Sequence, residues 1–360
     1  MNFCAPLDDI PINSKTIAQH KATLAALKKS GMNAKSGRLL FEALIYAPTA
    51  SLEKLALKWI KKHPEHQYTP PLTALILKAF PDSDLSDFTR DLLQNYPLGM
   101  SLSYLIRAVL NSTKHRRRFY KLIENRMDSE PESFSWLGSL HTQKASKQVE
   151  SLTIRWIELS KESKESYISC IATATSYPAA MEVIFDWLKG QTKYKGFLCF
   201  GIHGLYYQAG QNHPALLPKL IRYTRAFLKE HDRARDKDGD FARVYGALIE
   251  ATGSNADIKT ARAWFIRGKN RKKRFSWYIL GAVLRCRSAR SKDGVWAIAE
   301  AKSLLKSQSE EFWAPVLVGE LLRACPDEEV LEMARSCLAR VPLTWLGNLI
   351  EEKEEAALKT

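Results

Sequence analysis

Apolar residues recur three and four positions apart along most of this chain, which is the spacing of a helix with one or more buried faces. The strict alternation of apolar and polar residues that strands would show is scarce. The clearest apolar segments are PLTALILKAF (71–80), SLSYLIRAVL (101–110), SYISCIATAT (166–175), DFARVYGALIEAT (240–252), FSWYILGAVLRC (275–286) and EFWAPVLVGELLRAC (311–325). The pattern predicts an all-α fold.

A second type of predicted helix alternates with these segments and carries a pair of large apolar residues. Nine such pairs occur, and their first residues are on average about 35 positions apart. The pairs are Trp59-Ile60, Leu92-Leu93, Leu122-Ile123, Trp156-Ile157, Trp187-Leu188, Phe227-Leu228, Trp264-Phe265, Leu304-Leu305 and Cys337-Leu338. In seven of them a small residue stands three positions earlier, on the same helix face, where it allows a neighbouring helix to approach closely. In three copies Pro64, Pro97 or Pro342 follows and predicts the helix end.

Alternating helices of two types, joined by short turns, form an array of helical hairpins. Over residues 38–350 the chain resembles HEAT-like and TPR-like α-solenoids, although the TPR signature is met in no copy. The resemblance implies a right-handed α-solenoid of about nine helix-pair repeats. Residues 1–37 are then an N-terminal segment with a first helix, and 351–360 a charged C-terminal tail. An irregular helical bundle with an accidental period is the alternative.

The composition adds a strong positive charge to this picture. The 360 residues include 54 Lys and Arg against 39 Asp and Glu, which gives a net charge of +15. Such a balance favours nucleic acid, an anionic membrane surface or an acidic protein as partner. The six cysteines are scattered without a CxxC pair, and no apolar run approaches the roughly 20 residues of a membrane helix. We therefore expect a cytoplasmic protein that does not insert into membranes.

The positive charge is concentrated between Lys259 and Lys292, where twelve basic residues occur with no acidic one. Within it, GKNRKKR forms a predicted exposed loop between helices at 258–268 and 275–287. The residues expected to hold phosphates there are Lys269, Arg271, Lys272, Lys273 and Arg274. Trp277 and Tyr278 follow directly: either they stack on an unpaired base, or they belong to the core of their helix.

Two further groups of basic residues extend the hypothesis. The segment KHRRRFYK (114–121) adds Arg116, Arg117, Arg118 and Lys121, at what we expect to be another turn between helices. A basic residue also follows the small residue in several repeats, at Arg90, Arg225, Arg262, Lys302 and Arg335. Equivalent positions of successive repeats fall on one surface, so these residues predict a basic stripe. Ordinary solvent-exposed helix positions explain the same stripe without a ligand.

No pattern in the chain identifies an enzyme, a metal site or a cofactor. His63 and His66 lack the HExxH spacing, and Asp236, Asp238 and Asp240 lack the glycine and the glutamate of an EF-hand loop. We therefore expect no cofactor and a non-enzymatic scaffold that binds RNA or DNA through phosphates. A protein-interaction scaffold or sensor module for an acidic partner is the second hypothesis. Some HEAT-like proteins with basic helical repeats are DNA glycosylases, which is a third, but no catalytic residue can be assigned from them.

Overall fold

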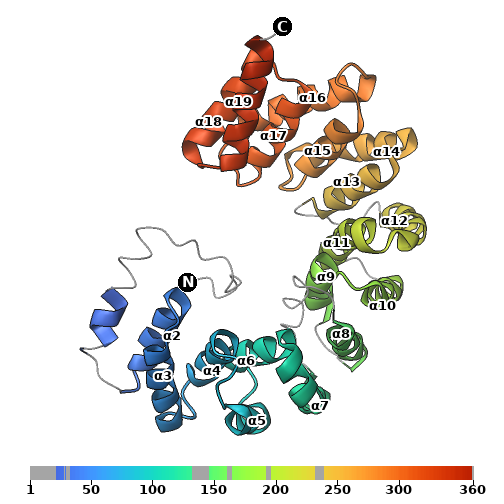
Figure 1. Ribbon diagram of the computed structural model, residues 1–360. Coiled ribbons are helices and arrows are strands. Elements are labelled where there is room, and N and C mark those ends of the chain that lie inside the picture. Colours follow the sequence, from blue (N-terminus) through green and yellow to red (C-terminus); the bar gives the residue numbers. More distant parts are fainter. Residues whose placement is uncertain are drawn as a thin grey trace. The chain divides into compact units, whose positions relative to one another are not determined.

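Every regular element that the computed structural model describes is a helix, which confirms the all-α prediction (Figure 1). The structure describes residues 22–27, 29, 33–131, 146–159, 164–191, 196–231 and 239–358. Their helices form two compact units: helices α2 to α8 belong to unit 1 and helices α9 to α19 to unit 2.

Unit 1 consists of two sets of alternating helices. Its elements are α2 (Ser36–Tyr46), α3 (Ala50–Lys62), α4 (Thr69–Ala79), α5 (Ser86–Asn95), α6 (Met100–Asn111), α7 (Thr113–Ser129) and α8 (Lys147–Leu159). Helix α4 packs against both α2 and α6, and α7 packs against α5, α6 and α8. Helix α4 is buried along almost its whole length, as its continuous apolar sequence predicts.

Unit 2 repeats this arrangement over more helices. Its elements are α9 (Lys164–Ala174), α10 (Pro178–Lys189), α11 (Gly196–Asn212), η2 (Pro214–Leu216), α12 (Leu217–Glu230), α13 (Asp240–Thr252), α14 (Asn255–Ile266), η3 (Asn270–Lys272), α15 (Trp277–Cys286), α16 (Lys292–Ser307), α17 (Ala314–Ala324), α18 (Glu328–Arg340) and α19 (Thr344–Leu358). Helices α9, α11, α13, α15, α17 and α19 each contact the next of that series. We call them the odd layer, and α10, α12, α14, α16 and α18 the even layer.

The two layers correspond to the two helix types of the sequence. The odd layer contains the continuous apolar segments, and α13 buries eight of its 13 residues. Even-layer helices are amphipathic: α12 buries only Leu220, Thr224, Phe227 and Leu228 along one face. All nine pairs of large apolar residues fall on α3, α5, α7, α8 or the even layer. The predicted alternation of helices is therefore present within each unit.

The small residues predicted from the sequence lie where helices approach each other closely. Thr224, Ala261, Ala301 and Ala334 are completely buried, each beside its apolar pair. In the odd layer, a Cβ atom added to Gly246 of α13 would lie 2.8 Å from the backbone oxygen of Tyr278 on α15. The backbones of these two helices are therefore in contact, and a larger residue at Gly246 would force them apart.

The ends of the helices follow from local signals. Pro64, Pro97 and Pro342 each lie two residues beyond the last residue of α3, α5 or α18, as expected of residues that cannot continue a helix. Asp327 begins α18 by accepting a hydrogen bond from the amide of Val330 at 3.0 Å. Helix α19 extends to Leu358, so residues 351–358 of the expected tail continue a helix.

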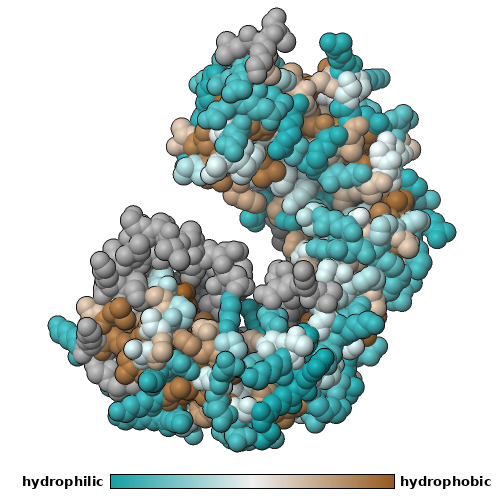
Figure 2. Space-filling view, viewed as in Figure 1, coloured by the Kyte–Doolittle hydropathy of each residue, from teal (hydrophilic) through white to brown (hydrophobic). Residues whose placement is uncertain are grey.

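The surface is mainly polar. Hydrophilic side chains cover most of the visible face of both units, and hydrophobic side chains reach it in separate patches (Figure 2). Among the described helices, none combines the length and the apolar character needed to cross a bilayer.

Candidate nucleic-acid interface

The segment 267–276, which we call the basic connection, joins α14 to α15. Gly268 has a positive φ of 58°, the left-handed conformation that commonly ends a helix. Asn270 donates its side-chain amide to the carbonyl oxygen of Trp264 at 2.8 Å, and Ser276 donates to the carbonyl of Asn270. These bonds satisfy backbone groups at the end of α14 and hold the short helix η3 in place.

The five predicted phosphate ligands differ in their surroundings. Arg271 pairs with Glu300 of α16 at 2.7 Å and also donates to Ser303. Lys273 is half-buried, with its ammonium 5.6 Å from the ring centre of Trp264. Lys269 and Lys272 are exposed and have no side-chain partner among the described residues. These two lysines are therefore the charges most available to an anion.

Arg274 connects the basic connection to an exposed aromatic residue of the next helix pair. Its guanidinium carbon lies 5.3 Å from the ring centre of Phe275 and 5.1 Å from that of Phe312. The Phe312 side chain is 63% exposed, while Phe275 is buried. Phe312 was not predicted as a site residue, because it belongs to an apolar segment (311–325) whose other aromatic residue, Trp313, is buried.

Trp277 and Tyr278 occupy positions in the packed part of the odd layer. Trp277 is 9% exposed, and its ring stacks on Trp313 with 6.2 Å between centres and 13° between planes. The Tyr278 ring lies 3.9 Å from that of Trp277 and meets His203 edge-on at 5.1 Å. Of the two alternatives for Trp277, these contacts favour the core, because its ring is covered by protein.

The second basic cluster lies inside a helix and not at the expected turn. Ser112 caps α7 by accepting a hydrogen bond from the amide of His115, so the helix begins before the cluster. Arg116 donates to the carbonyl of Leu110 at 2.8 Å, Arg118 donates to Ser86, and Lys121 pairs with Glu124. Arg117 is exposed and has no side-chain partner among the described residues. This cluster belongs to unit 1, and the basic connection to unit 2.

The basic stripe of the even layer is an ion-pair ladder. Arg225 of α12 binds Asp257 of α14 through two hydrogen bonds of 3.0 and 2.7 Å. At the equivalent positions, Arg262 of α14 pairs with Asp293 of α16 at 3.6 Å, and Lys302 of α16 pairs with Asp327 of α18 at 2.6 Å. Each basic residue thus reaches the next even-layer helix.

The acidic partners in this ladder lie where a helix stabilises negative charge. Asp257 and Asp293 lie in the first turns of α14 and α16, and Asp327 caps α18, so each faces the positive end of a helix dipole. Burial opposes the charge of Lys302, but hydrogen bonds with Asp327 and Glu329 raise its pKa. These basic residues therefore connect successive even-layer helices and are not free to hold a ligand. Arg90 and Arg335 of the stripe also pair with carboxylates, those of Asp87 and Glu354 respectively.

The acid-free run from Lys259 to Lys292 is likewise compensated in space. Arg285 of α15 lies between two carboxylates of neighbouring odd-layer helices, Glu250 on α13 and Glu320 on α17, the latter at 3.0 Å. Burial lowers the pKa of Arg285, but these two ion pairs outweigh it and raise the pKa overall. The local excess of positive charge is therefore smaller than the sequence alone indicates.

A second arginine of the odd layer lies among aromatic rings. The guanidinium carbon of Arg243 on α13 is 3.6 Å from the ring centre of Phe275 and 5.4 Å from that of Phe200. It also pairs with the carboxylate of Asp240 at 3.8 Å. Burial, together with the charges of Arg243 and Arg285, lowers the pKa of His203 on α11 to about 4.

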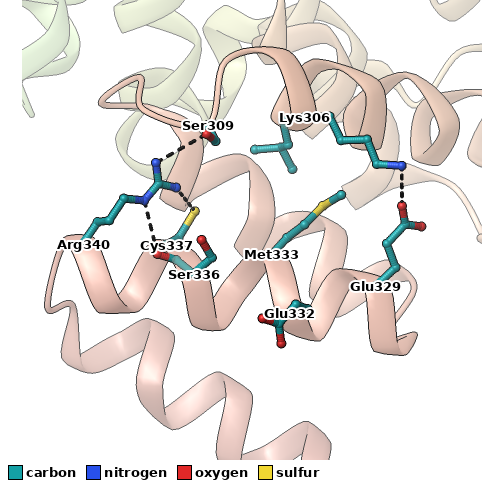
Figure 3. Close-up of a pocket in the computed structure, with 9 residues that line it drawn as sticks. Lys306, Ser309, Glu329, Glu332, Met333, Ser336, Cys337 and Arg340 are labelled. Atoms are coloured by element: carbon teal, nitrogen blue, oxygen red, sulfur yellow. Dashed lines mark hydrogen bonds and ion pairs between the residues drawn. The ribbon is translucent and has the colours of Figure 1, made fainter.

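A groove of 430 Å³ lies between α16 and α18 (Figure 3). Leu305 and Met333 contribute apolar surface to it. Lys306 pairs with Glu329 at one end, and Arg340 donates to Ser309 at the other. An equivalent groove between α12 and α14 includes Leu228, Lys229 and Thr260, so the feature recurs in the even layer.

Metal-binding geometry is absent from the part of the chain that the structure describes: it contains no group of three His, Cys, Asp or Glu residues that could hold an ion. His63 and His66 pack against the ring of Trp59, with 4.9 and 5.0 Å between ring centres. Asp236 and Asp238 of the acidic loop lie outside the described residues.

Comparisons of the chain with protein-family models, curated proteins and solved structures gave no match.

Proposed function

We propose that this chain is a non-enzymatic helical-repeat scaffold, a right-handed α-solenoid, that binds nucleic acid through phosphate contacts at the basic connection. The observation that carries the proposal is the contrast within one basic run. Arg262, Arg271 and Arg285 are paired with carboxylates, whereas Lys269 and Lys272 are exposed without a side-chain partner in the described chain.

Phosphates suit this arrangement physically. An exposed lysine without a partner breaks no ion pair when it binds a phosphate, and the counterions that the nucleic acid then releases favour binding. The contacts would be to the backbone of the polymer, which accords with the absence of a base-reading motif in the sequence. Arg117 of α7 is the member of the second cluster best able to add a further contact.

The test compares binding across a salt series. Fluorescence anisotropy would measure labelled single-stranded RNA, single-stranded DNA and duplex DNA against the intact protein and a Lys269→Gln, Lys272→Gln, Arg274→Gln variant. The loss of three phosphate contacts should reduce the slope of log K against log salt by about 2 for a single strand.

A matched control removes the same charge elsewhere. Lys54→Gln, Lys58→Gln, Lys61→Gln neutralises three exposed lysines of α3, which belongs to unit 1. It should retain the slope of the intact protein. The proposal is wrong if no polymer shows salt-dependent binding, or if the two variants behave alike.

The grooves of the even layer support a second candidate function, the binding of a peptide segment of an acidic protein. The groove between α16 and α18 combines apolar contacts from Leu305 and Met333 with Lys306 and Arg340 at its ends, and Glu329 and Glu332 also line it. A Met333→Glu variant would replace part of the apolar surface with a further negative charge. If a protein partner binds there, this variant abolishes its binding and leaves the binding of nucleic acid unchanged.

A further inference from the structure

Two phenylalanines hold equivalent positions just before consecutive odd-layer helices, yet their surroundings differ. Phe275 precedes α15, is 7% exposed and lies beneath the guanidinium of Arg243 at 3.6 Å. Phe312 precedes α17 and is 63% exposed. The residue that an arginine covers in one repeat is thus largely open to solvent in the next.

The exposed ring lies beside the basic connection. Arg274, which belongs to that connection, has its guanidinium carbon 5.1 Å from the ring centre of Phe312. An exposed phenyl ring next to guanidinium and ammonium groups is the combination with which proteins bind unpaired nucleotides, since the ring stacks on a base while the cations hold phosphates.

We infer that the nucleic acid bound by this protein is single-stranded, with one unpaired base stacked on Phe312. The inference rests on the proposed function. Lys269 and Lys272 hold phosphates of the neighbouring nucleotides, and Arg274 lies between them and the stacked base. A duplex cannot make this contact along its length, because both faces of each internal base are already stacked within the helix.

The charges around Phe312 also determine the path of the strand. Glu310 and Glu311 directly precede Phe312 and are exposed, so they repel phosphates along 308–311. The basic side chain in contact with the ring is that of Arg274. The strand therefore leads from Phe312 towards Arg274 and away from the acidic pair.

A fluorescent base analogue tests the stacking directly. Oligonucleotides of about ten nucleotides, DNA and RNA, would carry 2-aminopurine, whose emission falls when it stacks on an aromatic ring. With the intact protein, emission should fall on binding. Phe312→Ala should weaken single-strand binding about ten-fold and abolish the change in emission, while the salt slope stays the same because the phosphate contacts remain.

Two matched variants and a duplex control complete the experiment. Phe312→Trp should retain both affinity and stacking, and Val295→Ala, which shortens an apolar residue of α16 that is 56% exposed, should change neither. Duplex DNA of the same length should bind more weakly than the single strand and should be insensitive to Phe312→Ala.

The outcomes separate this inference from the proposed function. If Phe312→Ala binds single strands like the intact protein, while the Lys269, Lys272, Arg274 variant loses salt slope, the basic connection binds phosphates and the stacking inference fails. Tighter binding of the duplex than of the single strand overturns it as well. If no polymer binds the intact protein, both proposals fail together.

Discussion

The ion-pair ladder and the basic connection contain the same residue types within one unit, but the two regions use them differently. In the ladder, Arg225 meets Asp257 across 32 positions of sequence, and Lys302 meets Asp327 across 25. In the connection, Lys269 and Lys272 are exposed without a side-chain partner among the described residues. The ladder is part of the scaffold, and the connection is available to a ligand.

The difference shows that a count of charges along this sequence overstates the basic surface of the protein. A basic residue on one even-layer helix lies beside the start of the next, so its partner is 25 to 32 positions away in the sequence. Charge that is unbalanced within 30 residues can be balanced in space. Lys269 and Lys272 differ because they lie in a connection, where no neighbouring helix presents them with a carboxylate in the described structure.

The largest expected effect concerns the odd layer, where His203 lies near two arginines: Arg243, which pairs with Asp240, and Arg285, which pairs with Glu250 and Glu320. Burial and the two arginines lower the pKa of His203 to about 4, whereas in the unfolded chain it is near 6.5. Below pH 6.5 the unfolded state binds this proton first, so stability falls as the pH decreases. The loss reaches about 3 kcal/mol near pH 4.

A His203→Gln variant tests this expectation. Urea unfolding of this variant between pH 7 and 4 should show a pH dependence that is weaker by that amount. An identical pH dependence for intact protein and His203→Gln contradicts the expectation.

Arg243→Gln should also raise the pKa of His203, measured by NMR, more than Arg285→Gln does, because Glu250 and Glu320 already neutralise Arg285.

Breaking a ladder pair should have the next largest effect. Asp257 is 6% exposed and also accepts a hydrogen bond from Thr252, so Arg225→Met leaves a buried carboxylate without its cation. We expect a loss of about 2 kcal/mol in the free energy of unfolding, measured in urea. Adding Asp257→Asn should recover part of the loss. A double variant no more stable than Arg225→Met alone would mean that the two residues are not coupled.

The acidic pair before Phe312 should affect binding more than stability. Glu310→Gln, Glu311→Gln removes two negative charges beside the proposed strand and should tighten nucleic-acid binding about three- to ten-fold at low salt. The gain should shrink as salt increases. Glu351→Gln, Glu352→Gln on α19 is the control with the same change in charge, and equal gains in both variants would show only an effect of net charge.

The smallest expected effect completes the comparison. Lys269→Gln, Lys272→Gln should change the free energy of unfolding by less than about 0.5 kcal/mol, because exposed side chains without a partner contribute little to stability. Thermal unfolding of this variant beside Arg225→Met measures the contrast directly. A loss as large as that of Arg225→Met would show that the two lysines belong to the scaffold.

More of the fold than of the candidate site could be predicted from the sequence. Apolar periodicity is local, so the alternation of buried and amphipathic helices was evident, and Pro64, Pro97 and Pro342 marked helix ends correctly. The prediction that the cluster at 114–121 lies in a turn was wrong. The cap at Ser112, a single short side chain, starts α7 at Thr113, before the cluster. The predicted handedness and the full solenoid remain predictions.

The site depends on contacts between repeats, which the sequence does not display. Arg271 was expected to be free, but Glu300 lies 29 positions later on a helix that packs beside it. Phe312 and Phe275 both precede an apolar helix, but Arg243 covers the ring of Phe275 whereas that of Phe312 is largely exposed. Exposure of this kind is a property of the neighbouring helices and not of the residue itself.

The row formed by Glu250, Arg285 and Glu320 has a consequence for how such a chain can lengthen. Its members are 35 residues apart on α13, α15 and α17, and their charges alternate as acid, base and acid. Duplication of a single helix pair would set two arginines or two glutamates side by side, and like charges there repel. Duplication of two consecutive pairs preserves the alternation. The row thus ties the sign of the charge on each of these three helices to that of its neighbour, a constraint that an uncharged row would not impose.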